Sequence, residues 1–264
     1  MNLIITAGGT RERIDTVRTI TNEATGKLGS LIAEEFSRRL EDREHTIYYL
    51  CGIGSIVPKV RDENIHVIYI EGTSQLQSEM ERLLTSHEIH AVVHSMAVSD
   101  YRVKTITTME ILENIIRKKF LLSTESKSKS ESTFDQSWNI QLSEEIKSQS
   151  FQNGTKISSE IESPILILEK TPKIISIIKD LRPGTILVGF KLLSSVNEEV
   201  LIKTAYDLLI KNKCDYVFAN DTDSIKNGCQ EGFLLDERGS IIKYAGKENI
   251  AKGIADAILI GKKC

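Results

Sequence analysis

The stretch from Asn2 to Gly29, NLIITAGGTRERIDTVRTITNEATGKLG, decides the fold. It begins with the apolar run Leu3-Ile4-Ile5, breaks at Gly8-Gly9-Thr10 and leads into a helical pattern near Gly26. A buried strand, a glycine turn and a helix N-terminus, in that order, are typical of α/β proteins that hold phosphate groups. The stretch therefore predicts an anion-binding turn at the end of a first strand.

The composition limits the classes of protein to be considered. The chain has 264 residues, of which 40% are apolar and 27% charged, and its net charge is -3. These values fit a globular protein and do not favour a nucleic-acid binder, which usually has a basic face. The cysteines, Cys51, Cys214, Cys229 and Cys264, have no CxxC spacing, which favours reduced thiols. No apolar run reaches the roughly 18 residues of a membrane span, and no secretory signal is visible, so we expect a cytoplasmic protein.

Short strand patterns and helix patterns alternate along most of the chain. Strands are expected at 2–6, 45–50, 65–70, 91–94, 165–168, 185–190 and 215–219, with a hairpin of 233–235 and 241–244. Helices are expected at 28–40, 73–84, 198–211 and 247–260, and another from Thr171-Pro172. Thr73 is expected to cap the second helix. The alternation predicts a single Rossmann-like α/β domain over 1–264, with a mostly parallel sheet, helices on both faces and a C-terminal β-hairpin.

The alternation stops in one long polar segment. Residues 117–154 are rich in Ser, Lys, Glu and Gln and contain few large apolar residues. Such a composition predicts a flexible insertion. Long loops in compact domains are usually either variable surface loops or lids over a site, and both interpretations stay open. Lys156 follows this segment, so it is either a solvated surface lysine or a cation on a mobile flap.

The glycine turn alone suggests a nicotinamide-dependent enzyme, and that interpretation makes two demands. An acidic residue should end the second strand and hold the ribose hydroxyls, but this strand ends Tyr49-Leu50-Cys51-Gly52. A short-chain reductase should also contain Tyr-x-x-x-Lys, and no tyrosine in the chain has a lysine four residues on. The turn is therefore not expected to bind a dinucleotide.

Three further side chains are candidates for a site. Asn22 is either a turn residue or an amide that donates to a substrate oxygen, and the following Thr25-Gly26-Lys27 favours the second interpretation. Asp100 follows a predicted strand, where it either caps a helix or holds a ribose, a base amino group or Mg²⁺. Lys211 near a helix end is by default a partner of the helix dipole.

Together these pieces resemble the phosphopantothenate–cysteine ligase family of coenzyme A biosynthesis. The matching motifs span almost the whole chain in the expected order: TAGGTRERIDTVRTITNEATGKLG (6–29), MAVSDYRV (96–103), TKISS (155–159), LEKTPKII (168–175), VGFK (188–191) and KNKCDYVFAND (211–221). The first motif is the most specific, because its spacing from the glycines to Thr21-Asn22 and Gly26-Lys27 is kept. The chain is similar to the stand-alone ligase of streptococci, so a separate phosphopantothenoylcysteine decarboxylase is expected to act next.

The resemblance implies a two-step reaction. The carboxylate of 4'-phosphopantothenate attacks the α-phosphorus of CTP, which releases pyrophosphate and forms an acyl-cytidylate. The amine of L-cysteine then attacks the acyl carbon, which releases CMP and forms 4'-phospho-N-pantothenoyl-L-cysteine. Mg²⁺ is the implied cofactor, because it would screen the triphosphate charge. ATP is the alternative nucleotide.

The resemblance also implies roles for particular residues. Asn22 and Lys156 are the implied catalytic residues, with Asn22 on the acyl group and Lys156 on the phosphates. The implied substrate-binding residues are Arg18, Asn22, Gly26 and Lys27. The implied nucleotide-binding residues are Gly8, Gly9, Ser95, Met96, Asp100, Lys156, Pro172, Lys173, Ile174, Ile175, Phe190 and Lys211. No metal ligands are predicted.

The chain departs from the family pattern at two places. Lys173 follows Pro172 where the family often has Asp, and Asp207 stands where it often has a lysine, for which Lys203 is a candidate replacement. Both departures concern the nucleotide contacts. A homodimer is expected by resemblance alone. Two other classes stay open: an NAD(P)-dependent reductase on the same fold, and a non-catalytic nucleotide-binding relative.

Overall fold

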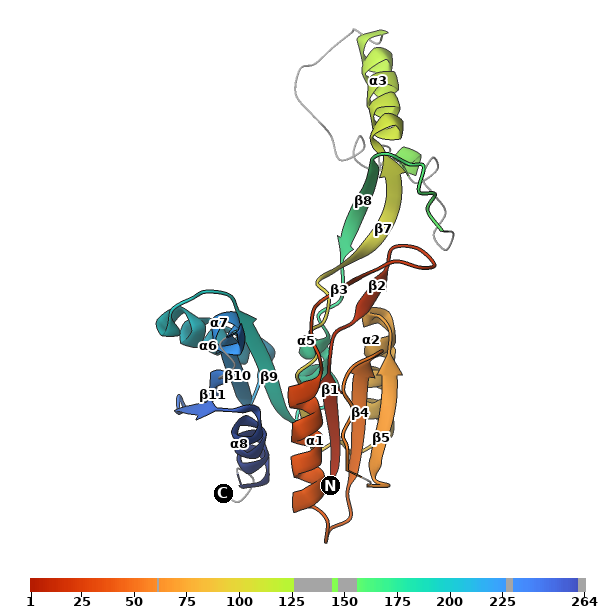
Figure 1. Cartoon of the computed structure of the whole chain (residues 1–264). Coiled ribbons are helices and arrows are strands. Elements are labelled where there is room, and N and C mark those ends of the chain that lie inside the picture. Colours follow the sequence, from red (N-terminus) through yellow and green to blue (C-terminus); the bar gives the residue numbers. More distant parts are fainter. Residues whose placement is uncertain (61, 126–143, 147–155, 227–229, 261–264) are drawn as a thin grey trace. The chain divides into compact units, whose positions relative to one another are not determined.

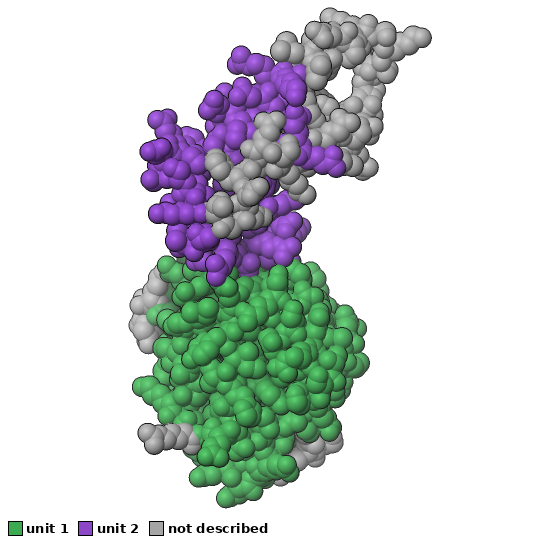
Figure 2. All heavy atoms as spheres, turned by 90° about the vertical axis from the view of Figure 1, so that its right-hand side faces the viewer, with its two compact units in different colours: residues 1–11, 21–100, 172–264 green, residues 12–20, 101–171 purple. Residues whose placement is uncertain are grey.

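The computed structural model describes residues 1–60, 62–125, 144–146, 156–226 and 230–260 (Figure 1). These residues form two compact units, coloured green and purple in Figure 2. Unit 1 comprises residues 1–11, 21–100 and 172–264, and unit 2 comprises residues 12–20 and 101–171. The chain therefore leaves and re-enters unit 1 twice. That residues 1–264 form a single domain stays a prediction.

Unit 1 is built on a central sheet that, in the described part of the chain, has eight strands. Their order is β12-β11-β10-β9-β6-β1-β4-β5. The strands are β1 Asn2–Ala7, β4 Thr46–Gly52, β5 Ile65–Ile70, β6 Ala91–His94, β9 Ile186–Leu193, β10 Tyr216–Asp221, β11 Glu231–Asp236 and β12 Ile241–Ala245. The strands from β10 to β5 in this order pair in parallel, and β11 and β12 add an antiparallel hairpin. The predicted Rossmann-like fold with a C-terminal hairpin is confirmed.

Helices cover both faces of this sheet. They are α1 Lys27–Arg39, α2 Thr73–Ser86, α5 Ile174–Leu181, α6 Glu198–Asn212, α7 Thr222–Lys226 and α8 Lys247–Ile260. One buried cluster joins α1 and α8 to the sheet, with Phe36 and Ile254 among its members. The other joins α2, α5 and α6 to the opposite face, with Met80 and Ile178 among its members. Strands buried on both faces read as nearly continuous apolar runs, which is why β1 was recognisable in the sequence.

The local sequence explains how the two ends of α1 are formed. Its N-cap, Gly26, has a φ of 76°, a left-handed conformation that glycine adopts without strain. Leu28, Ile32 and Phe36 recur at helical spacing, and Ile32 and Phe36 are fully buried. Arg38 and Arg39 lie in the last turn, where cations interact favourably with the helix dipole.

Unit 2 has a simpler core. The antiparallel strands β7 Tyr101–Thr108 and β8 Pro164–Lys170 pair along their lengths, and helix α3, Met109–Glu125, follows β7. Ile106 of β7 and Ile115 of α3 are buried. The short strands β2 Arg11–Arg13 and β3 Thr19–Thr21 also pair with each other.

Several local expectations need correction. The strand predicted at 165–168 exists as β8, but it pairs with β7 outside the main sheet. Gly72, not Thr73, is the N-cap of α2, and α5 begins at Ile174 rather than at Thr171-Pro172 because Lys173 still has extended backbone angles. Helix α3 covers the start of the predicted insertion 117–154, and most of the remainder lies outside the described residues.

Candidate active site

The site predicted at the glycine turn lies at the point of the sheet where the strand order reverses. Strands β1 and β6 are adjacent. The next strand of the sheet after β1 is β4, reached through α1, and the next strand of the sheet after β6 is β9, reached through α5. β4 and β9 lie on opposite sides of the central pair, and α1 and α5 lie on opposite faces of the sheet. In doubly wound folds, ligands bind in the crevice at the carboxyl ends of such strands. Gly8 and Gly9 follow β1, and Ser95 and Met96 follow β6, so this arrangement brings all four to one edge. We call it the carboxyl edge.

Backbone hydrogen bonds hold the two turns together. The N–H of Ala97 donates to the oxygen of Gly8 at 2.8 Å, and the N–H of Thr10 donates to the oxygen of Ala97 at 3.2 Å. Gly8 has a φ of +74°, and a Cβ there would lie 1.8 Å from Ser55 Oγ. A Cβ on Gly9 would lie 2.6 Å from the backbone oxygen of Asn22. Any side chain at these two positions would therefore displace the turn or its neighbours.

Buried hydroxyl groups tie the segment after β6 to β1. The hydroxyl of Thr6 accepts from the N–H of Met96 at 3.1 Å and bonds to Nδ1 of His94 at 3.0 Å. The Thr10 hydroxyl accepts from the N–H of Ser99 at 2.9 Å. Burial lowers the pKa of His94 to about 4, so the imidazole is neutral near pH 7. Sequence reasoning missed this network, because its partners lie about 90 residues apart.

Asn22 lies at the carboxyl edge. Its side-chain amide nitrogen donates to the oxygens of Ala97 and Val98, at 3.5 and 3.3 Å. Both distances are longer than a typical N–H···O hydrogen bond, so these contacts hold the amide weakly. The side chain is exposed. The amide can therefore turn toward a ligand at this edge of the sheet at small cost.

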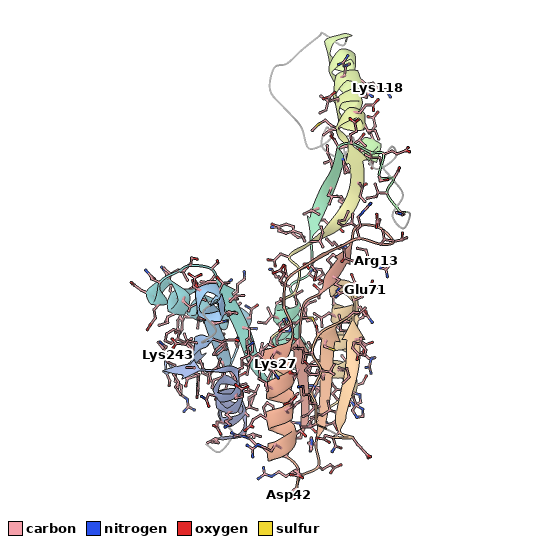
Figure 3. The ribbon with its side chains drawn as sticks, viewed as in Figure 1. Arg13, Lys27, Asp42, Glu71, Lys118 and Lys243 are labelled. Carbon is pink, nitrogen blue, oxygen red and sulfur yellow. The ribbon has the colours of Figure 1, made fainter. Side chains whose placement is uncertain are left out.

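The N-terminus of α1 belongs to the same edge. A Cβ on Gly26 would lie 3.3 Å from the nitrogen of Gly8, so the helix begins beside the glycine turn. The N-cap residue, Gly26, has no side chain to cap this end, and the N–H of Lys27 donates to the hydroxyl of Thr25 at a long 3.3 Å. Lys27 is its first residue, labelled at one end of α1 in Figure 3. Backbone N–H groups and a lysine together favour an anion.

Two of the predicted nucleotide-binding residues form an ion pair. The ammonium group of Lys173, at the N-cap of α5, contacts the carboxylate of Asp100 after β6. Both side chains are about two-thirds exposed, at 67% and 64%, so the pair is solvated and weak. Pro172 is exposed, whereas Ile174 is buried in the core. Ile174 can thus offer a ligand only its backbone, whereas Ile175 is partly exposed.

Phe190 has the position of a core residue near the same edge. It follows Gly189, which pairs with His94 at the end of β6. Its ring lies 5.6 Å from the ring of Phe218, tilted by 51°. It is only half-buried.

The structure does not bring Lys211 to the carboxyl edge. Helix α6 runs back from the end of β9 to the start of β10, and the N–H of Asp215 donates to the oxygen of Leu187 at the start of β9. Lys211, in the last turn of α6, therefore lies near the opposite, amino edge of the parallel strands. Its predicted nucleotide contact stays a prediction without support from this placement. The candidate replacement Lys203 is exposed on the same helix.

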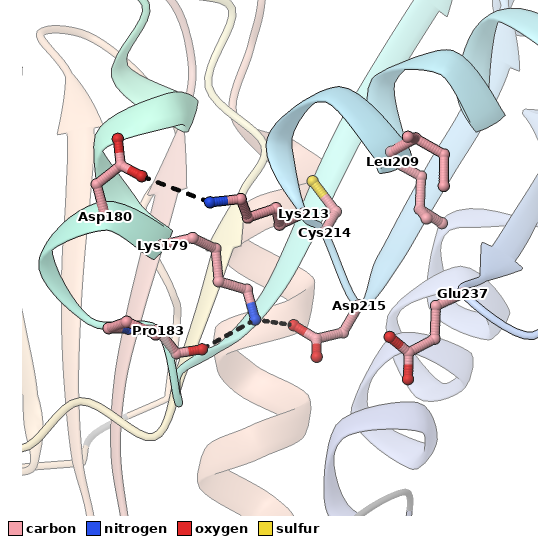
Figure 4. Close-up of a pocket in the computed structure, with 9 residues that line it drawn as sticks. Lys179, Asp180, Pro183, Leu209, Lys213, Cys214, Asp215 and Glu237 are labelled. Carbon is pink, nitrogen blue, oxygen red and sulfur yellow. Dashed lines mark hydrogen bonds and ion pairs between the residues drawn. The ribbon is translucent and has the colours of Figure 1, made fainter.

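The amino edge carries a hollow of its own, shown in Figure 4. It has a volume of about 640 Å³. Both of its cations pair with carboxylates of the lining: the ammonium of Lys179 lies 2.7 Å from the carboxylate of Asp215, and that of Lys213 lies 3.9 Å from Asp180. Cys214 also lines it, and burial raises the pKa of this thiol to about 12, so the thiol is unreactive. Nothing in this lining resembles a catalytic arrangement.

The remaining predicted residues belong to unit 2. Arg18 forms an ion pair with the buried carboxylate of Asp15 at 2.8 Å, and it also donates to the oxygen of Ile157 at 3.4 Å. Lys156 is exposed and directly precedes the buried Ile157. The two residues thus lie close to each other, on segments about 140 positions apart in the sequence.

The described residues do not fit a magnesium ion held by protein ligands alone. Among them, no group of three His, Cys, Asp or Glu side chains is placed to bind a metal. Asp100, whose carboxylate was one candidate for holding Mg²⁺, is paired with Lys173. Within the same residues, no helix is both long and apolar enough to cross a membrane.

The fold and the site together define the class of this protein: a doubly wound α/β protein whose glycine turn lies at the carboxyl ends of the adjacent strands β1 and β6. The family described as the DNA/pantothenate metabolism flavoprotein C-terminal domain matches residues 1–126 and 147–260. The chain therefore belongs to this family.

Individual relatives agree with this assignment. The chain is 31% identical over 218 residues to the coenzyme A biosynthesis bifunctional protein CoaBC of Thermococcus kodakarensis, covering 83% of this chain and 40% of that protein. It is 28% identical over 113 residues to CoaBC of Mycobacterium tuberculosis, covering 43% of this chain and 25% of that protein. The chain thus spans well under half the length of these relatives.

Solved structures show the same fold. The DNA/pantothenate metabolism flavoprotein from Streptococcus pneumoniae superposes with a TM-score of 0.77 at 30% identity, over 99% of both chains. A Cab2 mutant in complex with phosphopantothenate-cysteine superposes with a TM-score of 0.60 over 100% of this chain and 89% of that one. Its sequence identity of 15% supports the fold alone.

Proposed function

We propose that this chain is a phosphopantothenate–cysteine ligase of coenzyme A biosynthesis. The observation that carries the proposal is the placement of Asn22 beside the glycine turn, between β1 and the segment after β6. The family membership and the names of the CoaBC relatives support it. The location in the cytoplasm and a separate decarboxylase that acts next are parts of the same proposal.

The proposed chemistry begins with activation of a carboxylate. An oxygen of the phosphopantothenate carboxylate attacks the α-phosphorus of CTP, and the bond to pyrophosphate breaks. The amine of L-cysteine then attacks the acyl carbon, the bond to CMP breaks and the amine loses a proton. Activation is needed because a carboxylate is a poor acylating agent at neutral pH.

The carboxyl edge offers groups that suit each part of the acyl-cytidylate. The N–H groups at the start of α1 and the ammonium of Lys27 favour a phosphate. The Asn22 amide would donate to the acyl oxygen, whose negative charge grows when cysteine attacks. The turns at Gly8-Gly9 and Ser95-Met96 and the start of α5 border the space for the nucleotide, and Lys173 adds a positive charge there.

The proposal also includes Lys156, Mg²⁺ and a second copy of the chain. Lys156 would neutralise charge on the phosphates during activation. Mg²⁺ would be carried on the triphosphate, which needs few or no protein ligands. A homodimer fits the edge strand β12, whose Ile241 and Ile242 are exposed, because apolar edge strands invite pairing.

A pyrophosphate assay tests the proposal. The protein is mixed with phosphopantothenate, L-cysteine and Mg²⁺, with CTP or ATP in turn. We expect pyrophosphate release that depends on phosphopantothenate and is faster with CTP, together with the cysteine adduct by mass spectrometry. No release with either nucleotide would contradict the proposal. Tight binding of NADPH in place of CTP would favour a reductase, and CTP binding without turnover would favour a non-catalytic relative.

A further inference from the structure

The turn between β2 and β3 contains Asp15, a carboxylate whose two oxygens each accept two hydrogen bonds. Asp15 is buried, at 3% exposure, and its Oδ1 accepts from the N–H groups of Val17 and Arg18 at 2.8 and 2.7 Å. Its Oδ2 accepts from the Arg18 guanidinium at 2.8 Å and from the N–H of Ile157 at 3.2 Å. Each oxygen thus serves two donors.

The same contacts hold Ile157, which lies on a segment distant in the sequence; we say that they fasten Ile157. Ile157 donates its N–H to Asp15, and its carbonyl oxygen accepts from Arg18 at 3.4 Å. Its side chain is also buried, at 7% exposure. Both backbone polar groups of Ile157 are therefore held by one ion pair 139 to 142 positions earlier in the chain. All of these residues belong to unit 2.

Asp15 is negatively charged, which strengthens the hydrogen bonds that it accepts. Burial alone would raise the pKa of its carboxyl group, but the N–H groups of Val17, Arg18 and Ile157 and the Arg18 guanidinium together lower it below its ordinary value. The group is consequently ionised at neutral pH and accepts all four hydrogen bonds. A charged acceptor makes stronger hydrogen bonds than a neutral one.

We infer that Asp15 is a positioning residue for Lys156, acting through the fastened backbone of Ile157. The inference rests on the proposed role of Lys156 in forming the acyl-cytidylate. A long lysine side chain reaches a defined point only when its backbone is held, and a displacement of about 1 Å in a catalytic group can cost about 100-fold in rate. Asp15 itself touches no substrate in this account.

The variant Asp15→Asn keeps the size of the side chain and removes its double acceptor pattern. Whichever way the amide turns, its NH₂ group faces two donors, either Val17 and Arg18 or Arg18 and Ile157. The matched control is Glu169→Gln, which removes an ion pair with Arg102 on β7 and β8 of the same unit. The control leaves Ile157 fastened.

A double-mutant cycle on pyrophosphate release with CTP and phosphopantothenate tests the inference. We expect Lys156→Gln to slow release about 100-fold or more and Asp15→Asn to slow it roughly 10- to 100-fold. The rate of the double variant should be within about 5-fold of the rate of Lys156→Gln alone, because Asp15 acts through Lys156 and has no further effect once that lysine is absent. Effects that multiply, or a wild-type rate for either single variant, would overturn the inference.

A second measurement is independent of catalysis. Trypsin cleaves after lysine, so cutting of the Lys156–Ile157 bond reports how firmly Ile157 is held. Asp15→Asn should speed this cut at least about 10-fold relative to Glu169→Gln, with the fragment identified by mass spectrometry. Equal rates would overturn the fastening. If the wild-type protein releases no pyrophosphate, the proposed function fails while the cutting rates still decide whether Asp15 holds Ile157.

If Asp15→Asn does not fold, hydrogen exchange in the wild-type protein decides the same point. The Ile157 amide should exchange at least about 100-fold more slowly than an unstructured amide, because its N–H is buried and bonded. Exchange at the unstructured rate would overturn the inference.

Discussion

The two edges of the parallel sheet in unit 1 use polar groups in opposite ways. At the amino edge, Lys179 and Lys213 pair with Asp215 and Asp180, so both cations of the lining are neutralised within it. At the carboxyl edge, glycines, hydroxyls and backbone N–H groups shape a turn, Asn22 is held by long contacts, and the ion pair of Lys173 with Asp100 is mostly exposed. Self-paired charges stabilise a fold, whereas weakly held donors beside a helix N-terminus are available to a ligand. This difference favours the carboxyl edge as the place of the proposed function.

The largest expected effect comes from exchanging a glycine at each edge. Gly9→Ala places a methyl group 2.6 Å from the Asn22 oxygen, so it should displace Asn22 and lower ligase turnover about 100-fold. Gly184→Ala, just before β9 at the amino edge, meets nothing within 4 Å and should leave turnover within about 2-fold. Steady-state rates and unfolding curves for both variants check this. Equal losses in turnover would remove the distinction between the edges.

The second effect is a pH dependence that originates at the carboxyl edge. The pKa of buried His94 is lowered to about 4, below the ordinary value of 6.5. As pH falls below 6.5, the unfolded chain gains a proton at His94 that the folded protein does not gain until about pH 4. The free energy of unfolding should therefore fall across this window, on the order of 2 kcal/mol.

Urea unfolding of the wild type and His94→Asn at several pH values isolates this contribution. The variant should show a flatter dependence between pH 6.5 and pH 4, because it lacks the titrating group. Identical slopes would show that His94 is protonated equally in both states.

The smallest effect compares two lysines. Lys173→Gln removes a positive charge at the start of α5 and should raise the KM for CTP by about 5-fold at low salt, less at high salt. Lys179→Gln, at the amino edge, should leave that KM within about 2-fold and instead lower stability by about 1 kcal/mol, because Asp215 loses its partner. Nucleotide titrations at two salt concentrations, with unfolding curves, check both. The reverse pattern would place the nucleotide at the amino edge.

The sequence predicted those features that depend on local patterns. The apolar run of β1, the glycines after it and the helical spacing from Leu28 to Leu40 were enough to locate the turn and α1, within one residue at each end of the helix. The sheet order places β6 beside β1, which is why the separate motifs around Gly8 and Ser95 meet.

The sequence did not predict features that depend on contacts between distant segments. The alternating Val103, Thr105 and Thr107 of β7 resemble a strand, but its pairing with β8 across about 60 residues could not be read from spacing. The Asp15 contact with Ile157 and the Thr6 contact with His94 are of the same kind. The position of Lys211 at the amino edge also required the structure, because the motif match does not show at which edge of the sheet α6 ends.

The most direct test of the central claim, that the carboxyl edge holds the acyl-nucleotide intermediate at Asn22, is a trapping experiment. Asn22→Asp is incubated with phosphopantothenate and radiolabelled CTP, with and without L-cysteine, and the protein-bound label is measured. The carboxylate keeps the size of the side chain but cannot donate to the acyl oxygen at neutral pH. We predict that acyl-cytidylate accumulates while cysteine adduct forms about 100-fold more slowly than in the wild type. Wild-type turnover, with no accumulated intermediate, would contradict the account.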